Sequence, residues 1–246
     1  MQASRDLSCY ALACWTAREE TPDALAYRFL SLIDQLREID PVLEFWTSGA
    51  KGPKKFEVLR DHYADVIKAC LSKDDFGEPL PIDGYWFGAI TRGQQPSRSF
   101  AINVHAGAYK PMAEHQNDLM FTTSRMVDAD PSSLTYEIFR PVLRAIVATW
   151  APEDCIVMPR PLLDLIDLDR HFRDPWMQYL SKPFADLITP PEDVLTERFA
   201  DGGLLMIATT DTFDVDNRNH VAGAHAIGAA TAPLEKLPYV YHPKTR

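Results

Sequence analysis

The sequence predicts an α+β fold, in which a mixed, largely antiparallel sheet is flanked by amphipathic helices. Apolar residues recur at the helical interval in three long segments, and three consecutive strand-like segments are joined by loops that contain Gly, Pro and Gln. Two further segments are apolar on both faces, as in strands that are covered on both sides of a sheet. Because no internal repeat or convincing linker interrupts this pattern, residues 1–246 are predicted to form a single domain.

The N-terminal part is predicted to be a strand followed by a helix. Residues 8–15, SCYALACW, are apolar or small on both alternating faces and predict a covered strand. Thr21 is a favourable N-cap and Pro22 suits the first helical position, so a helix is expected from there to about Ile39. Asp40 should end it, because a residue that precedes proline disfavours the α conformation.

The remaining elements follow from the same two periodicities. Helices are expected at 56–71, with Cys70 pointing inward, at 134–150 and at 218–232. Pro141 must either begin the second of these helices or kink it. Strands are expected at 85–91, 99–106 and 118–124 as an antiparallel meander, and at 155–158, 176–180 and 203–209. The last of these strands is apolar on both faces and is therefore expected near the centre of the sheet.

Composition narrows the classes of function. The formal net charge of −10 argues against direct binding of nucleic acid, because phosphates would be repelled, and no segment approaches the eighteen apolar residues of a membrane span. The four cysteines form no CxxC pair and no Cys/His spacing typical of zinc sites. The N-terminal apolar run is short for a signal peptide and follows an acidic residue, so a cytoplasmic protein with reduced thiols is expected.

The stretch DTFDVDNRNHVAGAH contains the strongest candidate for a metal site. Asp211, Asp214 and Asp216 are followed by His220 and His225. The aspartates do not fit a calcium-binding loop, which needs a glycine at its sixth position and a glutamate at its twelfth, and the two histidines are too far apart around a helix to share one ion. We therefore favour a structural interpretation, a strand followed by a loop that caps a helix. A metal-dependent hydrolase that uses the three aspartates remains the alternative.

No complete catalytic motif is present, and the sequence predicts no catalytic residue, cofactor or metal ion. It lacks G-x-S-x-G, P-loop, G-x-G-x-x-G and H-E-x-x-H motifs. The acidic run LLDLIDLDRHFRD, which ends at Asp174, is interpreted as a solvated helix face. A small-molecule pocket lined by Tyr85, Trp86 and His105 is a further alternative.

Three segments together resemble the immunity protein 52 family of bacterial polymorphic toxin, contact-dependent and type VI secretion systems. They are YALACWTAREETPDALAYRFLSLIDQLREIDPVLEFW, DPWMQYLS and DGGLLMIATTDTFDVDNRNHVAGAHAIGAATAPL. The last is the most specific, because a double glycine, an apolar strand, a Phe-Asp loop and a small-residue helix occur in the family's order. The resemblance implies a non-enzymatic protein that binds a cognate toxin, often a restriction-endonuclease-like nuclease, and protects the cell that produces it.

An acidic inhibitor suits such a partner, because a nuclease presents basic groups to nucleic acid. The candidate partner-binding residues follow the first strand and the last one. They are Trp15, Glu19, Glu20, Asp211, Asp214 and Asp216. If the two strands are parallel neighbours, both loops leave the same edge of the sheet and form one acidic surface.

Overall fold

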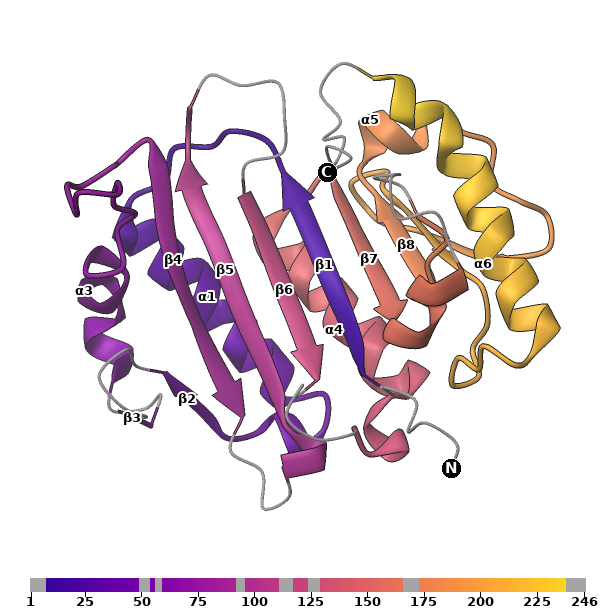
Figure 1. Cartoon of the computed structure of the whole chain (residues 1–246), viewed down its shortest axis with the longest axis horizontal. Coiled ribbons are helices and arrows are strands. Elements are labelled where there is room, and N and C mark those ends of the chain that lie inside the picture. The colour runs from indigo at the N-terminus through magenta and orange to yellow at the C-terminus, as the bar shows by residue number, and fades with distance from the viewer. Residues whose placement is uncertain are drawn as a thin grey trace.

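A single ten-stranded sheet forms the centre of the fold. The computed structural model describes residues 8–48, 54–55, 59–91, 96–110, 117–123, 129–165 and 173–237. Within them the strand order is β3-β2-β4-β5-β6-β1-β7-β8-β10-β9 (Figure 1). The strands are β1 (Cys9–Trp15), β2 (Trp46–Ser48), β3 (Lys54–Lys55), β4 (Asp83–Thr91), β5 (Phe100–Ala108), β6 (Asn117–Thr123), β7 (Asp154–Pro159), β8 (Met177–Leu180), β9 (Leu195–Arg198) and β10 (Leu204–Ile207). The predicted α+β class is confirmed, and all the described strand pairs are antiparallel.

Helices cover the two faces of this sheet unequally. The α-helices are α1 (Pro22–Arg37), α3 (Tyr63–Lys68), α4 (Tyr136–Trp150), α5 (Lys182–Ala185) and α6 (Arg218–Thr231), with short 3-10 turns η1 (Pro41–Leu43), η2 (Arg60–His62), η3 (Pro96–Arg98), η4 (Pro131–Ser133), η5 (Arg160–Leu165) and η6 (Ala232–Lys236). Figure 1 shows α1 and α4 behind the sheet and α6 at the side of β8. Cys155 and Val157 of β7 belong to the core that contains α1 and α4, whereas Ile156 packs with Ala224 of α6. Successive residues of a strand point to opposite faces, so α6 covers the other face.

Local signals place the two long helices as predicted. Thr21 caps α1 by accepting a hydrogen bond from Ala24 N at 3.2 Å, and Pro22 is its first residue. Pro141 lies inside α4. Phe139 and Trp150 of α4 are fully buried, and Phe139 contacts Phe100 and Phe121 of the sheet edge to face. The core between the sheet and α1 and α4 is therefore aromatic.

Other expectations need correction. The helix expected at 56–71 is limited to η2 and α3, and residues 56–58 lie outside the described residues. Strand β10 was expected near the centre of the sheet, but it lies next to the edge strand β9. It is nevertheless fully buried, because Leu205 packs into the main core and Met206 packs beneath α6.

None of the described helices is both long enough and apolar enough to cross a membrane.

Candidate functional site

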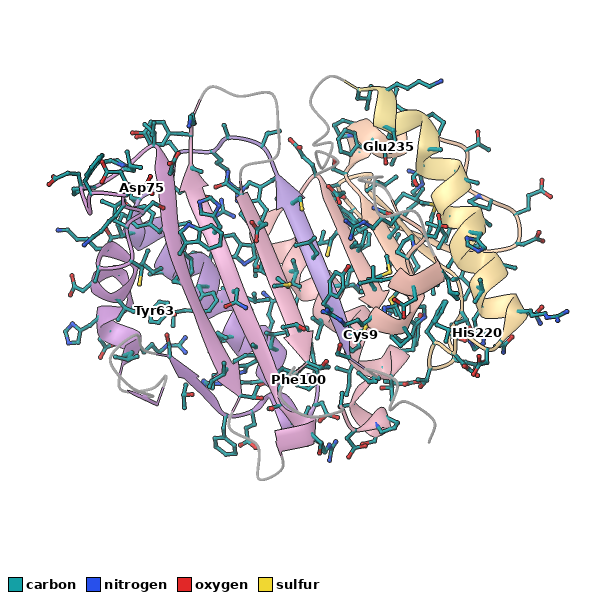
Figure 2. All side chains as sticks on the ribbon, in the orientation of Figure 1. Cys9, Tyr63, Asp75, Phe100, His220 and Glu235 are labelled. Carbon is teal, nitrogen blue, oxygen red and sulfur yellow. The ribbon has the colours of Figure 1, made fainter. Side chains whose placement is uncertain are left out.

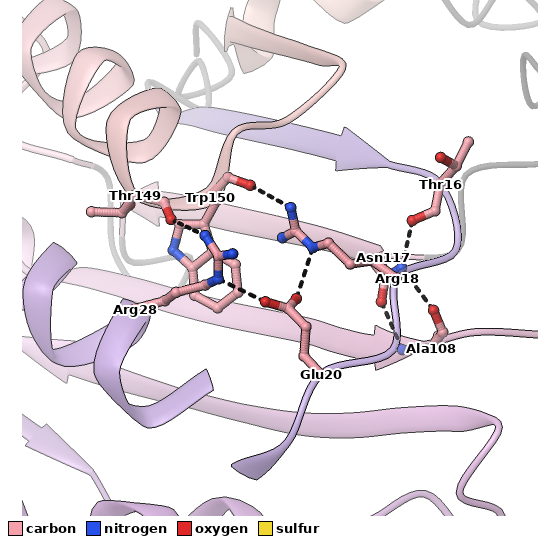
Figure 3. Close-up of polar contacts among 8 residues, drawn as sticks. All are labelled: Thr16, Arg18, Glu20, Arg28, Ala108, Asn117, Thr149 and Trp150. Carbon is pink, nitrogen blue, oxygen red and sulfur yellow. Dashed lines mark hydrogen bonds and ion pairs between the residues drawn. The ribbon is translucent and has the colours of Figure 1, made fainter. Parts of the chain in front are cut away.

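The loop that follows β1 is held by a polar network around Glu20 (Figure 3). The Glu20 carboxylate accepts hydrogen bonds from Arg18 Nε at 2.9 Å and from Arg28 Nε at 2.6 Å, and its side chain is only 6% exposed. The same guanidinium groups donate to the carbonyls of Trp150, at 3.0 Å, and Thr149, at 2.7 Å. Positive charges at the end of a helix stabilise its unpaired carbonyls. Glu20 therefore ties the loop and α1 to the C-terminus of α4.

Trp15 is also an internal residue. Its side chain is 2% exposed and its ring lies 5.4 Å from the ring of Trp150. The guanidinium of Arg18 lies over the Trp15 ring, with Cζ 5.2 Å from the ring centroid. Of the three residues predicted in this loop, Glu19 alone is exposed. Trp15 and Glu20 cannot serve as exposed contacts, and their burial by long-range partners is not visible in the sequence.

The loop after β10 uses its polar groups to begin α6. Asn217 is the N-cap and accepts from Asn219 N at 3.0 Å, while Asp214 Oδ1 accepts from Asp216 N at 2.9 Å. His220 is buried and accepts from Asp214 N through Nδ1 at 3.1 Å. These contacts agree with the capping interpretation. Asp211, Asp214 and Asp216 are all exposed, and within the described residues no three His, Cys, Asp or Glu side chains are grouped as a metal site.

The two predicted loops lie at opposite ends of the strands. Strands β1 and β10 are separated by β7 and β8, and each of the three pairings from β1 to β10 is antiparallel. Strand β10 therefore runs opposite to β1, and the loops that follow these strands leave opposite ends. The expected single acidic surface, which required parallel neighbours, is not formed.

Asp174 was expected on a solvated helix face and is instead buried. Its Oδ2 lies 2.7 Å from Nδ1 of His225, on α6. Gly228 of α6 packs against the same aspartate, and a Cβ at that position would lie 2.7 Å from Asp174 Cγ. The pair holds α6 against the segment that precedes β8. Residues 166–172 of the acidic run lie outside the described residues.

On β4, β5 and β6, the face that points away from α1 and α4 is not covered by any described helix (Figure 1). Trp86 and Ile90 of β4 are exposed on this face. Trp86 stacks on His105 with the ring centroids 4.1 Å apart, and His105 Nε2 lies 2.6 Å from the carbonyl oxygen of Asp83. Tyr85 packs into the core on the opposite face, so Tyr85, Trp86 and His105 do not line one pocket, which the small-ligand alternative had required. Burial raises the pKa of Asp118, which is paired with His105 in the sheet.

Comparisons with known proteins identify the family. No curated protein matches the chain. Among solved structures, the Pseudomonas aeruginosa T6SS protein PA0821 is similar, with a TM-score of 0.53 and 11% identity over 90% of this chain and 72% of that one. At this identity the similarity establishes the fold alone. The family model of immunity protein 52 matches residues 8–233, which is nearly the full chain. The chain therefore belongs to the immunity protein 52 family, as the sequence segments predicted.

Proposed function

We propose that this protein is an immunity protein that binds a cognate bacterial toxin and neutralises it as a stoichiometric complex. The family match over residues 8–233 is the observation that carries this proposal. Inhibition by binding needs a stable surface rather than a set of reacting groups. The fold supplies such a surface, because buried networks such as that of Glu20 fix the loops at the ends of the strands.

We further propose that the toxin is a nuclease, of the restriction-endonuclease-like class, and that the complex forms in the cytoplasm. The net charge of −10 supports a basic partner, since complementary charge raises association rates by about ten- to a thousandfold at low salt. The structural similarity to a type VI secretion system protein supports delivery of the toxin by such a system. Direct contacts with nucleic acid or a membrane are not part of the proposal.

The exposed carboxylates at the two ends of the strands are the candidate contacts. Glu19 lies at one end of the sheet, and Asp211, Asp214 and Asp216 lie at the opposite end. Trp15 and Glu20 are enclosed in the fold, so in this proposal they stabilise the protein and do not contact the toxin. Because the two ends are separate, the carboxylates at one end can be substituted without disturbing those at the other.

The test is inhibition of the toxin encoded beside this protein. Cleavage of DNA or RNA by the purified toxin should fall linearly with added protein and end at about a one-to-one ratio. An unrelated protein of similar size and net charge is the control, because any polyanion competes weakly for a basic surface. Unchanged cleavage at molar excess would refute the proposal. Inhibition equal to that of the control would refute specific binding.

A further inference from the structure

A hairpin that precedes β4 presents one aromatic side chain almost entirely to solvent. This hairpin, residues 71–83, is closed by antiparallel bridges between Leu71 and Tyr85 and between Lys73 and Pro79. At its tip, Phe76 is 92% exposed. Single exposed apolar residues are common on protein surfaces, so exposure alone identifies no site. Three further properties of the hairpin make Phe76 unusual.

The first property is a rigid tip. Asp74 Oδ1 accepts hydrogen bonds from Phe76 N at 2.9 Å and from Glu78 N at 2.8 Å, and Asp74 N donates to Glu78 O at 2.9 Å. Gly77 completes the turn at φ +85°, a conformation that favours glycine. None of these bonds uses the phenyl ring. The turn would form with many residues at position 76, and it fixes the backbone that carries the ring before any partner arrives.

The second property is charge around the ring. Asp75 and Glu78 are exposed on either side of Phe76. An aromatic ring bordered by charges resembles the anchors of protein interfaces, in which a desolvated aromatic residue is surrounded by a polar rim. Its complement is an apolar pocket the size of a phenyl ring, bordered by Lys or Arg.

The third property is the position of the hairpin beside the loop of Glu19. Strand β4 runs opposite to β1, so β4 begins at the end of the sheet where β1 ends. Two consecutive residues at the end of β5 connect the segments: Ala108 O accepts from Arg18 N at 2.9 Å, and Tyr109 N donates to Ile82 O at 3.0 Å. The base of the hairpin and the loop of Glu19 therefore lie at the same end of the sheet. Figure 2 shows Asp75 at this end and His220 of the later loop at the opposite end.

We propose that Phe76 is the principal anchor of the toxin complex and inserts into an apolar pocket on the basic surface of the toxin, with Asp75, Glu78 and Glu19 facing the surrounding cations. This inference rests on the proposed function and makes it more specific. It places the toxin at the end of the sheet that carries the hairpin, rather than at the end that carries Asp211. Because the backbone of the tip is already ordered, binding loses little backbone conformational entropy there, and the main entropic cost is the rotamer freedom of the ring.

The test compares three variants in titrations against the purified toxin. Phe76→Ala should raise the dissociation constant by at least about 30-fold, which is the effect of removing a typical interface anchor. Phe45→Ala is the matched control, because this phenylalanine is 61% exposed outside the hairpin, and its removal should change affinity less than twofold. Asp75→Asn combined with Glu78→Gln should slow association at low salt, with an effect that fades as salt screens the charges. All three should keep the thermal midpoint of the wild type, since the altered side chains are exposed.

The outcomes separate the inference from the function on which it rests. If wild-type protein neutralises the toxin and Phe76→Ala binds equally well, the anchor is refuted while the immunity function stands. If wild-type protein does not bind the toxin, both fall. The inference is also refuted if Phe76→Ala abolishes self-association of this chain and leaves toxin binding unchanged, because the ring would then serve a contact between copies.

Discussion

Substitution of Glu20 by glutamine should destabilise the fold without altering the toxin-binding surface. The carboxylate accepts one hydrogen bond from each of two guanidinium groups, and glutamine keeps a single acceptor oxygen and directs an NH₂ group at the other donor. Removing one partner of a fully buried ion pair costs about 3–5 kcal/mol. Arg18 and Arg28 are partly exposed and keep their backbone carbonyl partners, so we expect a smaller loss of about 2 kcal/mol.

Urea unfolding followed by tryptophan fluorescence measures this loss, and the adjacent Glu19 supplies a matched control. Glu19→Gln removes the same charge from an exposed side chain and should change the free energy of unfolding by less than about 0.5 kcal/mol. In binding the order reverses: Glu19→Gln should slow association with the toxin at low salt, whereas folded Glu20→Gln should bind like the wild type. Equal stability of the two variants would refute the structural role of Glu20. A Glu20→Gln variant that is stable but does not bind would show that Glu20 contacts the toxin.

Three further predictions concern stability and reactivity. Gly228→Ala should lower the free energy of unfolding by about 1–3 kcal/mol, because its Cβ would overlap the Asp174 carboxylate, and a double-mutant cycle with Asp174→Ala should show partial recovery. Hydrogen bonds from Arg140 lower the pKa of Glu197; the stabilisation is thus complete above the ordinary glutamate pKa and is lost as pH falls through the lowered value. Arg140→Met should accordingly reduce the acid dependence of the thermal midpoint. In the native protein only Cys70 should react with a thiol reagent, and slowly, because burial raises its pKa too. The other three cysteines are buried and have raised pKa values, so they should react only after urea unfolds the protein.

Elements with strong local signals were predictable from sequence. Thr21 and Pro22 define the start of α1 because capping depends on neighbouring residues only. The meander of β4, β5 and β6 follows from alternation and short connections, which are also local. The edge strand β9 was missed, since its residues LTER are mostly exposed and carry no apolar alternation. Its Glu197 accepts a hydrogen bond from Arg140 of α4, which is 57 residues away in the chain, so this contact depends on the tertiary packing.

The candidate site was less predictable because it depends on pairs that are far apart in the chain. Arg18 reaches Trp150 and Arg28 reaches Thr149 across more than 120 residues, so the sequence does not show that Glu20 is enclosed. The hairpin, in contrast, has a local signal in the sequence. The segment DDFGE places an aromatic residue inside a turn sequence of acidic residues and glycine. The turn itself does not require this phenylalanine, because its hydrogen bonds use only backbone groups and the Asp74 carboxylate.

Antiparallel pairing decides which acidic loops act together. An odd number of antiparallel steps separates strands that run in opposite directions, and there are three such steps both from β1 to β10 and from β1 to β4. The loop after β1 is consequently separated from the loop after β10 and joined to the hairpin before β4. Asp214 and Asp74 show that part of the acidic charge serves local turns. The net charge of −10 favours a basic partner in general, whereas topology places the charges near Glu19 and Phe76 at the same end of the sheet.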